Sequence, residues 1–97
     1  MKRTTIKGLQ AYADEENRNN RQSGLELDWF DILYQRLENG NISEVKQDIQ
    51  SMSKRETLIV IDASVSRKNE ECAYEENLLN RIYLYAFNSL ASKLKKR

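Results

Sequence analysis

Apolar residues in the last third of the chain, residues 69–97, recur at the three- and four-residue spacing of an amphipathic helix. The main apolar stripe contains Cys72, Leu79, Ile82, Tyr83, Ala86, Leu90 and Leu94. Glutamates gather at the start of this segment and lysines at its end, where each sign of charge stabilises a helix. We therefore predict one long helix over residues 69–97, with Asn69 as its N-cap.

Several apolar residues of this segment lie outside the main stripe. Tyr74, Leu78 and Tyr85 point away from it, and Leu84 lies further round the helix. These side chains need cover either from the first two helices of the chain or from a second protein. Because tyrosine is enriched in protein interfaces, we predict a partner-binding surface formed by Tyr74, Leu78, Arg81 and Tyr85, with internal coverage as an equal alternative.

The first part of the chain predicts a helix followed by a polar connector. Thr4 or Thr5 can cap this helix. Its thin apolar stripe consists of Ile6, Leu9 and Ala13. Residues 17–24 contain no apolar side chain and are predicted to connect this helix to the next.

A second helix is predicted after the connector. Ser23 and Glu26 have the spacing of a capping box, and Asn39 with Gly40 fits a left-handed C-terminal cap. Its apolar residues fall within a narrow arc and are Trp29, Phe30, Leu33 and Leu37. This arc makes it the best candidate for a core helix after the last one.

Residues 43–66 predict two further helices. The first begins at Ser43, and a capping box of Ser53 and Glu56 precedes the second. The β-branched run at 57–61 is also compatible with a short strand, over 57–62 in an α+β fold, but few segments are available to pair with it. Helix is therefore preferred.

Since neither Gly nor Pro interrupts residues 43–66, these two helices can continue as one arm that packs against residues 69–97. The predicted fold is an all-α bundle of four to five helices, built on a long C-terminal α-hairpin. We expect residues 1–97 to form a single helical domain.

The composition fits a small globular protein, because 39% of the 97 residues are hydrophobic and 32% are charged. A net charge of +1 gives no strong overall field for nucleic acid or an anionic membrane. The single cysteine excludes an internal disulfide, and no apolar run has the length of a transmembrane helix or a signal peptide. We predict a cytoplasmic protein that does not bind membranes.

Candidate catalytic residues are scarce. The chain has no histidine, and therefore lacks the usual general base and the commonest transition-metal ligand. A single cysteine and three isolated glycines provide neither a thiolate zinc site nor a phosphate-binding loop. Asp28 and Asp31 lie one helical turn apart, but acidic residues are favoured early in a helix for electrostatic reasons. The sequence predicts no enzyme, no cofactor, no metal site and no small-molecule substrate.

Basic residues offer an alternative function in nucleic-acid association. They occur near both ends of the chain and in the segments 54–55 and 67–68. The candidate phosphate-binding residues are Lys54, Arg55, Lys93, Lys95, Lys96 and Arg97. Residues 58–61 are apolar where a DNA-recognition helix needs polar side chains, so any such binding would depend on charge and not on a motif.

The preferred function is therefore protein binding, to another protein or to a second copy, through the C-terminal helix. The richness in Asn, Lys, Glu and Ile, together with the absence of Pro and His, is typical of short reading frames from AT-rich bacteria, their phages and plasmids. Such a source would favour a small regulator, modulator or inhibitor.

Overall fold

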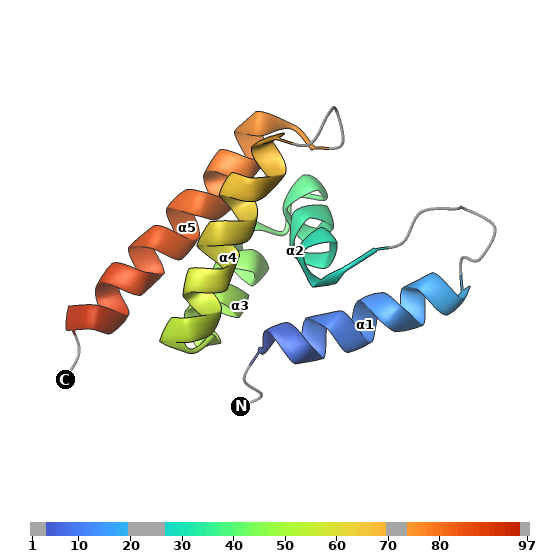
Figure 1. Ribbon diagram of the computed structural model, residues 1–97, viewed down its shortest axis with the longest axis horizontal. Helices are drawn as coiled ribbons and strands as arrows, with labels where there is room; N and C mark the ends of the chain where they lie inside the picture. Colours follow the sequence, from blue (N-terminus) through green and yellow to red (C-terminus); the bar gives the residue numbers. More distant parts are fainter. Residues whose placement is uncertain (1–3, 20–26, 70–73, 96–97) are drawn as a thin grey trace.

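The computed structural model describes residues 4–19, 27–69 and 74–95, which form a bundle of five α-helices and one short 3-10 helix (Figure 1). The elements are α1 (Ile6–Asn19), α2 (Trp29–Glu38), α3 (Ile42–Ser51), α4 (Lys54–Ser66), the 3-10 helix η2 (Arg67–Asn69) and α5 (Glu76–Lys95). No strand occurs in the described residues, and residues 57–62 belong to α4. The predicted all-α bundle is confirmed.

Helix α2 lies at the centre of the bundle, and half of its residues are buried. The buried side chains are Phe30, Ile32, Leu33, Tyr34 and Leu37. The helix begins where Asp28 and Asp31 form a reciprocal capping box, whereas the predicted box of Ser23 and Glu26 lies outside the described residues. It ends before Gly40, whose φ of +88° confirms the predicted left-handed cap.

The predicted continuous arm over residues 43–66 is wrong, because the chain leaves the helical conformation at Met52 and Ser53. The cause is the predicted capping box of Ser53 and Glu56, which is present. An N-cap residue requires extended backbone, so the cap that starts α4 also ends α3. The hairpin consists of α4 and α5 alone, which run antiparallel in Figure 1, while α3 packs elsewhere along α5.

Two predicted helix ends are also displaced. Helix α1 continues to Asn19, so its last turn occupies the start of the predicted connector. The reason is that the Asn17 side chain donates to the carbonyl of Leu27 and accepts from its amide, which fixes the end of α1 against the start of α2.

Helix α5 starts at Glu76 and not near Asn69, which belongs to η2. The backbone amide of Glu75 donates to the Tyr34 hydroxyl, so this part of the chain is held by α2 before the helix begins. Glu70, Glu71 and Cys72, which belong to the predicted start of this helix, lie outside the described residues.

The core stripe of α5 is narrower than predicted. Leu79, Ile82 and Ala86 are buried as expected, whereas Tyr83 and Leu90 are only partly buried. Leu94, also predicted to face the core, is 63% exposed. The next core-facing residue is Lys93, whose ammonium donates to the Ile49 carbonyl and the Thr57 hydroxyl. This side chain therefore joins α3, α4 and α5.

Candidate protein-interaction surface

The surface predicted to bind a partner is largely engaged within the chain. Tyr74, Leu78 and Tyr85 are partly buried and pack against the core, while Arg81 is exposed. The Lys46 ammonium lies 5.1 Å from the centre of the Tyr85 ring, so α3 contributes to this cover. Much of the surplus apolar surface of α5 on this side is therefore covered internally.

Tyr74 belongs to a cluster of aromatic and charged side chains that joins the start of α2 to η2. The Arg67 guanidinium lies 4.7 Å from the Phe30 ring centre and 5.5 Å from that of Tyr74. It donates hydrogen bonds to Asp28 and to the Tyr74 hydroxyl, which in turn donates to Asp31. Each polar group of the cluster thus has a partner of complementary chemistry.

The pKa shifts in this cluster have clear physical causes. Burial opposes the charged form of Asp28, but the hydrogen bonds from Arg67 and the Asp31 amide outweigh it and lower the Asp28 pKa. Burial and the hydrogen bond to Asp31 raise the pKa of Tyr74 well above its usual range. Neither group exchanges protons readily near neutral pH, and the cluster fits a structural clamp better than an acid and base pair.

Exposed apolar side chains concentrate on the hairpin of α4 and α5. Six of the seven large hydrophobic residues that are exposed among the described ones belong to these two helices. Five of the six have exposed fractions between 45% and 63%, and four of these five share one side of the hairpin, as shown below. These four are Leu58, Val65, Phe87 and Leu94. This exposure is the main surface feature that internal packing leaves unexplained.

Leu58 and Val65 of α4 lie on the same side of the hairpin as Phe87 and Leu94 of α5. The Lys68 ammonium, just after α4, lies 5.9 Å from the Tyr83 ring centre on α5. On α4 the positions that continue upstream from Lys68 at three- and four-residue spacing are Val65, Ile61 and Leu58. On α5 the positions that continue downstream from Tyr83 are Phe87, Leu90 and Leu94. From this contact and the helical spacing we infer that the seven apolar residues lie on one side of the hairpin, which we call the hairpin face.

The hairpin face was absent from the predicted sites, although the sequence contains its signal. The spacing from Leu58 to Val65 is three and four residues, and that from Tyr83 to Leu94 is four, three and four. Each helix thus carries a second apolar seam beside the one that enters the core. Tyr83 and Leu90 fall within both the predicted core stripe and this second seam, so their spacing alone does not show which of the two faces the core.

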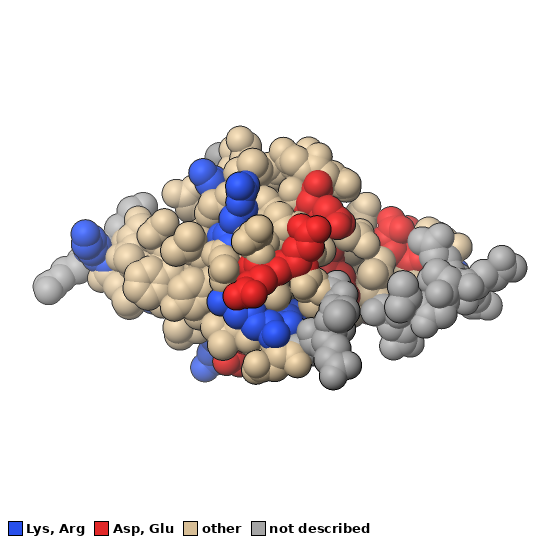
Figure 2. Space-filling view, turned by 90° about the horizontal axis from the view of Figure 1, so that it is seen from above, with Lys and Arg blue, Asp and Glu red and all other residues tan. Residues whose placement is uncertain are grey.

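The two rings of the hairpin face are ordered against each other. Tyr83 and Phe87 stack with their centres 6.1 Å apart and their planes 16° from parallel. Seen from above in Figure 2, the left-hand part of the molecule, over the C-terminal half of α5, is mostly uncharged, and charged side chains gather nearer the middle. This part of the surface therefore carries few charged side chains.

The predicted basic residues divide into three groups. Lys54, Arg55 and Lys95 are exposed, and the antiparallel hairpin brings the start of α4 and the end of α5 to one end of the molecule (Figure 1). Lys93 is partly buried and bonded within the bundle. Lys96 and Arg97 lie outside the described residues. One end of the hairpin is therefore basic.

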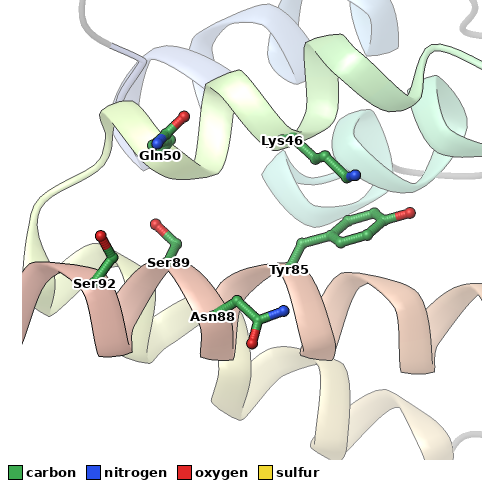
Figure 3. Close-up of a pocket in the computed structure, with 6 residues that line it drawn as sticks. All are labelled: Lys46, Gln50, Tyr85, Asn88, Ser89 and Ser92. Atoms are coloured by element: carbon green, nitrogen blue, oxygen red, sulfur yellow. The ribbon is translucent and has the colours of Figure 1, made fainter.

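A groove of about 320 Å³ separates α3 from the side of α5 next to Tyr85. In Figure 3 Lys46 and Gln50 project from α3, and the remaining lining residues from α5. Those residues are Tyr85, Asn88, Ser89 and Ser92. Each lining side chain carries a polar group and the groove is open, so it provides a hydrogen-bonding surface beside Tyr85 and not an enclosed reaction chamber.

Within residues 4–19, 27–69 and 74–95, no helix combines the length and the hydrophobicity that a membrane-spanning segment needs. The same part of the chain holds no group of three or more His, Cys, Asp or Glu side chains placed to bind a metal ion. No protein-family model, curated protein or solved structure matches this chain.

Proposed function

We propose that this protein is a non-enzymatic interaction protein, which acts by binding another protein or a second copy through the α4 and α5 hairpin. The observation that supports the proposal is the hairpin face, with seven apolar residues from two helices, four of which are 45% to 63% exposed. Contiguous apolar surface of this kind is typical of protein-binding sites.

The energetics of this surface also support binding. Covering a half-exposed Leu, Val or Phe side chain contributes roughly 1 kcal/mol, so four such residues supply about 4 kcal/mol before the other contacts are counted. Phe87 and Tyr83 add rigid aromatic area, which is enriched among the residues that dominate binding energies. A regulator or inhibitor that works by occupying a partner's surface needs no further chemistry.

Photocrosslinking tests this proposal against the surface predicted from the sequence. A benzophenone amino acid would be placed at position 87 on the hairpin face, at Arg81 on the predicted surface, or at Gln35 on α2 as a control; all three positions are exposed. We expect position 87 to give one crosslinked species of defined mass in cells, and Gln35 to give none. Mass spectrometry would identify the species.

The identified species would then be purified and its binding to the wild-type protein and to Phe87→Asp compared. We expect at least a 30-fold weaker complex with the variant, the effect of losing an interface hot spot. Circular dichroism serves as the folding control, since Phe87 is 51% exposed and its replacement should preserve the helices. Equal binding by both proteins, or no crosslink from position 87, contradicts the proposal.

A second candidate function is association with a polyanion such as nucleic acid. The observation in its favour is the basic end of the hairpin, where Lys54, Arg55 and Lys95 are exposed. Retention on heparin and duplex DNA should then weaken steeply as salt increases. The double variant Lys54→Ala and Arg55→Ala should elute at lower salt, whereas an unchanged elution profile would count against this function.

A further inference from the structure

The geometry points to a second copy of this chain as the occupant of the hairpin face. We propose that two hairpins pack face to face, with α5 antiparallel to the partner's α5, to form a four-helix interface. This inference rests on the proposed function, because it assumes that the hairpin face binds protein. It adds the identity of the occupant and the orientation of the two copies.

The size of the face fits a weak dimer. Helices α4 and α5 have 13 and 20 residues, which correspond to lengths of about 20 and 30 Å and widths of about 10 Å each. Each copy thus presents on the order of 500 Å², and two copies bury about 1,000 Å². This value lies near the lower limit of specific interfaces, so we expect dissociation in the micromolar range.

The spacing of the face fits an opposing helix pair. On both helices the residues of the hairpin face, exposed and partly buried together, recur every three and four residues, which is the pattern that allows side chains of one helix to fit between those of another. A two-fold axis places identical seams opposite each other. The partner's seam therefore has the same spacing and apolar character as the seam that it covers.

Charge decides the orientation of the two copies. The start of α5 is acidic, with exposed Glu75 and Glu76, and its end is basic, with Lys95 exposed. A two-fold axis parallel to the helices would place the basic ends of the two α5 helices next to each other. A two-fold axis perpendicular to the helices makes α5 antiparallel to the α5 of the partner copy. The acidic start of each α5 then lies near the basic end of the other. This antiparallel arrangement has complementary charges at both ends.

The molecular mass of the protein in solution tests directly whether a second copy covers the hairpin face. Sedimentation equilibrium and light scattering of the full chain, over concentrations from about 1 to about 500 μM, should show a reversible monomer to dimer transition. Phe87→Asp should raise the dissociation constant by about 30-fold or more while the helical circular dichroism is retained. Arg81→Asp is the matched control on α5 and should leave self-association unchanged.

Charge reversal tests the orientation. Glu76→Lys alone and Lys95→Glu alone should each weaken self-association by about ten-fold, because each places like charges together at both ends of the antiparallel pair. An equimolar mixture of the two variants should recover the wild-type affinity, since the mixed dimer restores opposite charges at both ends. If the mixture does not regain the wild-type affinity, the antiparallel orientation is wrong.

The remaining outcomes separate this inference from the proposed function. If the wild-type protein stays monomeric over the whole concentration range, a second copy is not the occupant of the hairpin face. A different protein crosslinked from position 87 would still support the proposed function in that case. A dimer that is unaffected by Phe87→Asp overturns the hairpin face as its interface. A dimer that is weakened by Phe87→Asp and by each charge variant alone, and that regains the wild-type affinity when the two charge variants are mixed, supports the whole inference.

Discussion

At the scale of single residues, Arg67 shows how one side chain stabilises two parts of the chain that are distant in sequence. Its guanidinium packs on the Phe30 and Tyr74 rings and donates to the carboxylate of Asp28, which is also the N-cap of α2. Arginine suits this position because its planar group can stack and form directed hydrogen bonds at the same time. The cap of α2 and the turn before α5 are thereby joined.

This arrangement predicts a specific dependence of stability on pH. The Asp28 pKa is lower in the folded protein than in the unfolded chain, where it is about 3.9. The contribution of Asp28 is therefore complete above that value, and is lost as pH falls through the lower pKa of the folded state. In Asp28→Asn this contribution should be absent, although Asn is also a good N-cap.

Urea unfolding of the wild-type protein and Asp28→Asn at about pH 7 and about pH 3 provides the measurement. The difference in unfolding free energy between the two proteins should be largest at the higher pH and should shrink at the lower one. A difference that is the same at both pH values would show that the Asp28 charge does not contribute through the Arg67 contact.

The roles of individual residues were only partly predictable. The sequence marks Tyr74 as apolar surface in need of cover, which is correct, but it gives no sign that Asp31 and Arg67 provide part of that cover. These contacts join positions that are 43 and 7 residues away from Tyr74. Helical periodicity describes each helix separately, and therefore does not report polar contacts between elements.

At the scale of the elements, the signals that depend on a few neighbouring residues were the most reliable. The capping box of Ser53 and the left-handed residue at Gly40 are both present. The lengths of α1 and α5 were less predictable, because Asn17 and Tyr34 fix those ends through contacts with other helices. The break between α3 and α4 follows from the cap at Ser53, because the extended backbone that an N-cap residue requires also ends the preceding helix.

The left-handed conformation at Gly40 can be tested by substitution. A Cβ atom at this position would meet no other atom within 4 Å, so the cost of Gly40→Ala arises from its φ of +88° and not from a steric clash. We expect a loss of about 1 kcal/mol in unfolding free energy. Gly40→Asn should lose less, because Asn tolerates this conformation better. Equal losses in urea unfolding would contradict this explanation.

At the scale of the whole molecule, the all-α architecture was predictable, because apolar periodicity and caps indicate helices directly. The candidate interface was not, because both seams of α5 are apolar and the sequence does not state which one enters the core. The structure resolves this ambiguity through Lys93, which points inward, and Leu94, which is 63% exposed. The hairpin face thus lies on roughly the opposite side of α5 from the predicted surface.

The attachment of α1 has a consequence for the motions of the protein. This helix buries only Leu9 and Ala13 of its own residues. Its start is held by polar contacts, in which Thr4 donates to Asp48 and to Ser51, and the Ile6 amide donates to Glu56. A helix with a thin apolar stripe is expected to open locally at a lower free energy than the core.

Hydrogen exchange followed by mass spectrometry should detect this opening. The amides of α1 should exchange faster than those of α2, and Thr4→Val should increase exchange in α1 about five-fold, corresponding to the loss of one hydrogen bond. Exchange in α5 serves as the internal reference and should stay unchanged. Local opening would then be confined to one side of the bundle: α1 would separate from α2, while the α4 and α5 hairpin on the opposite side would keep its structure.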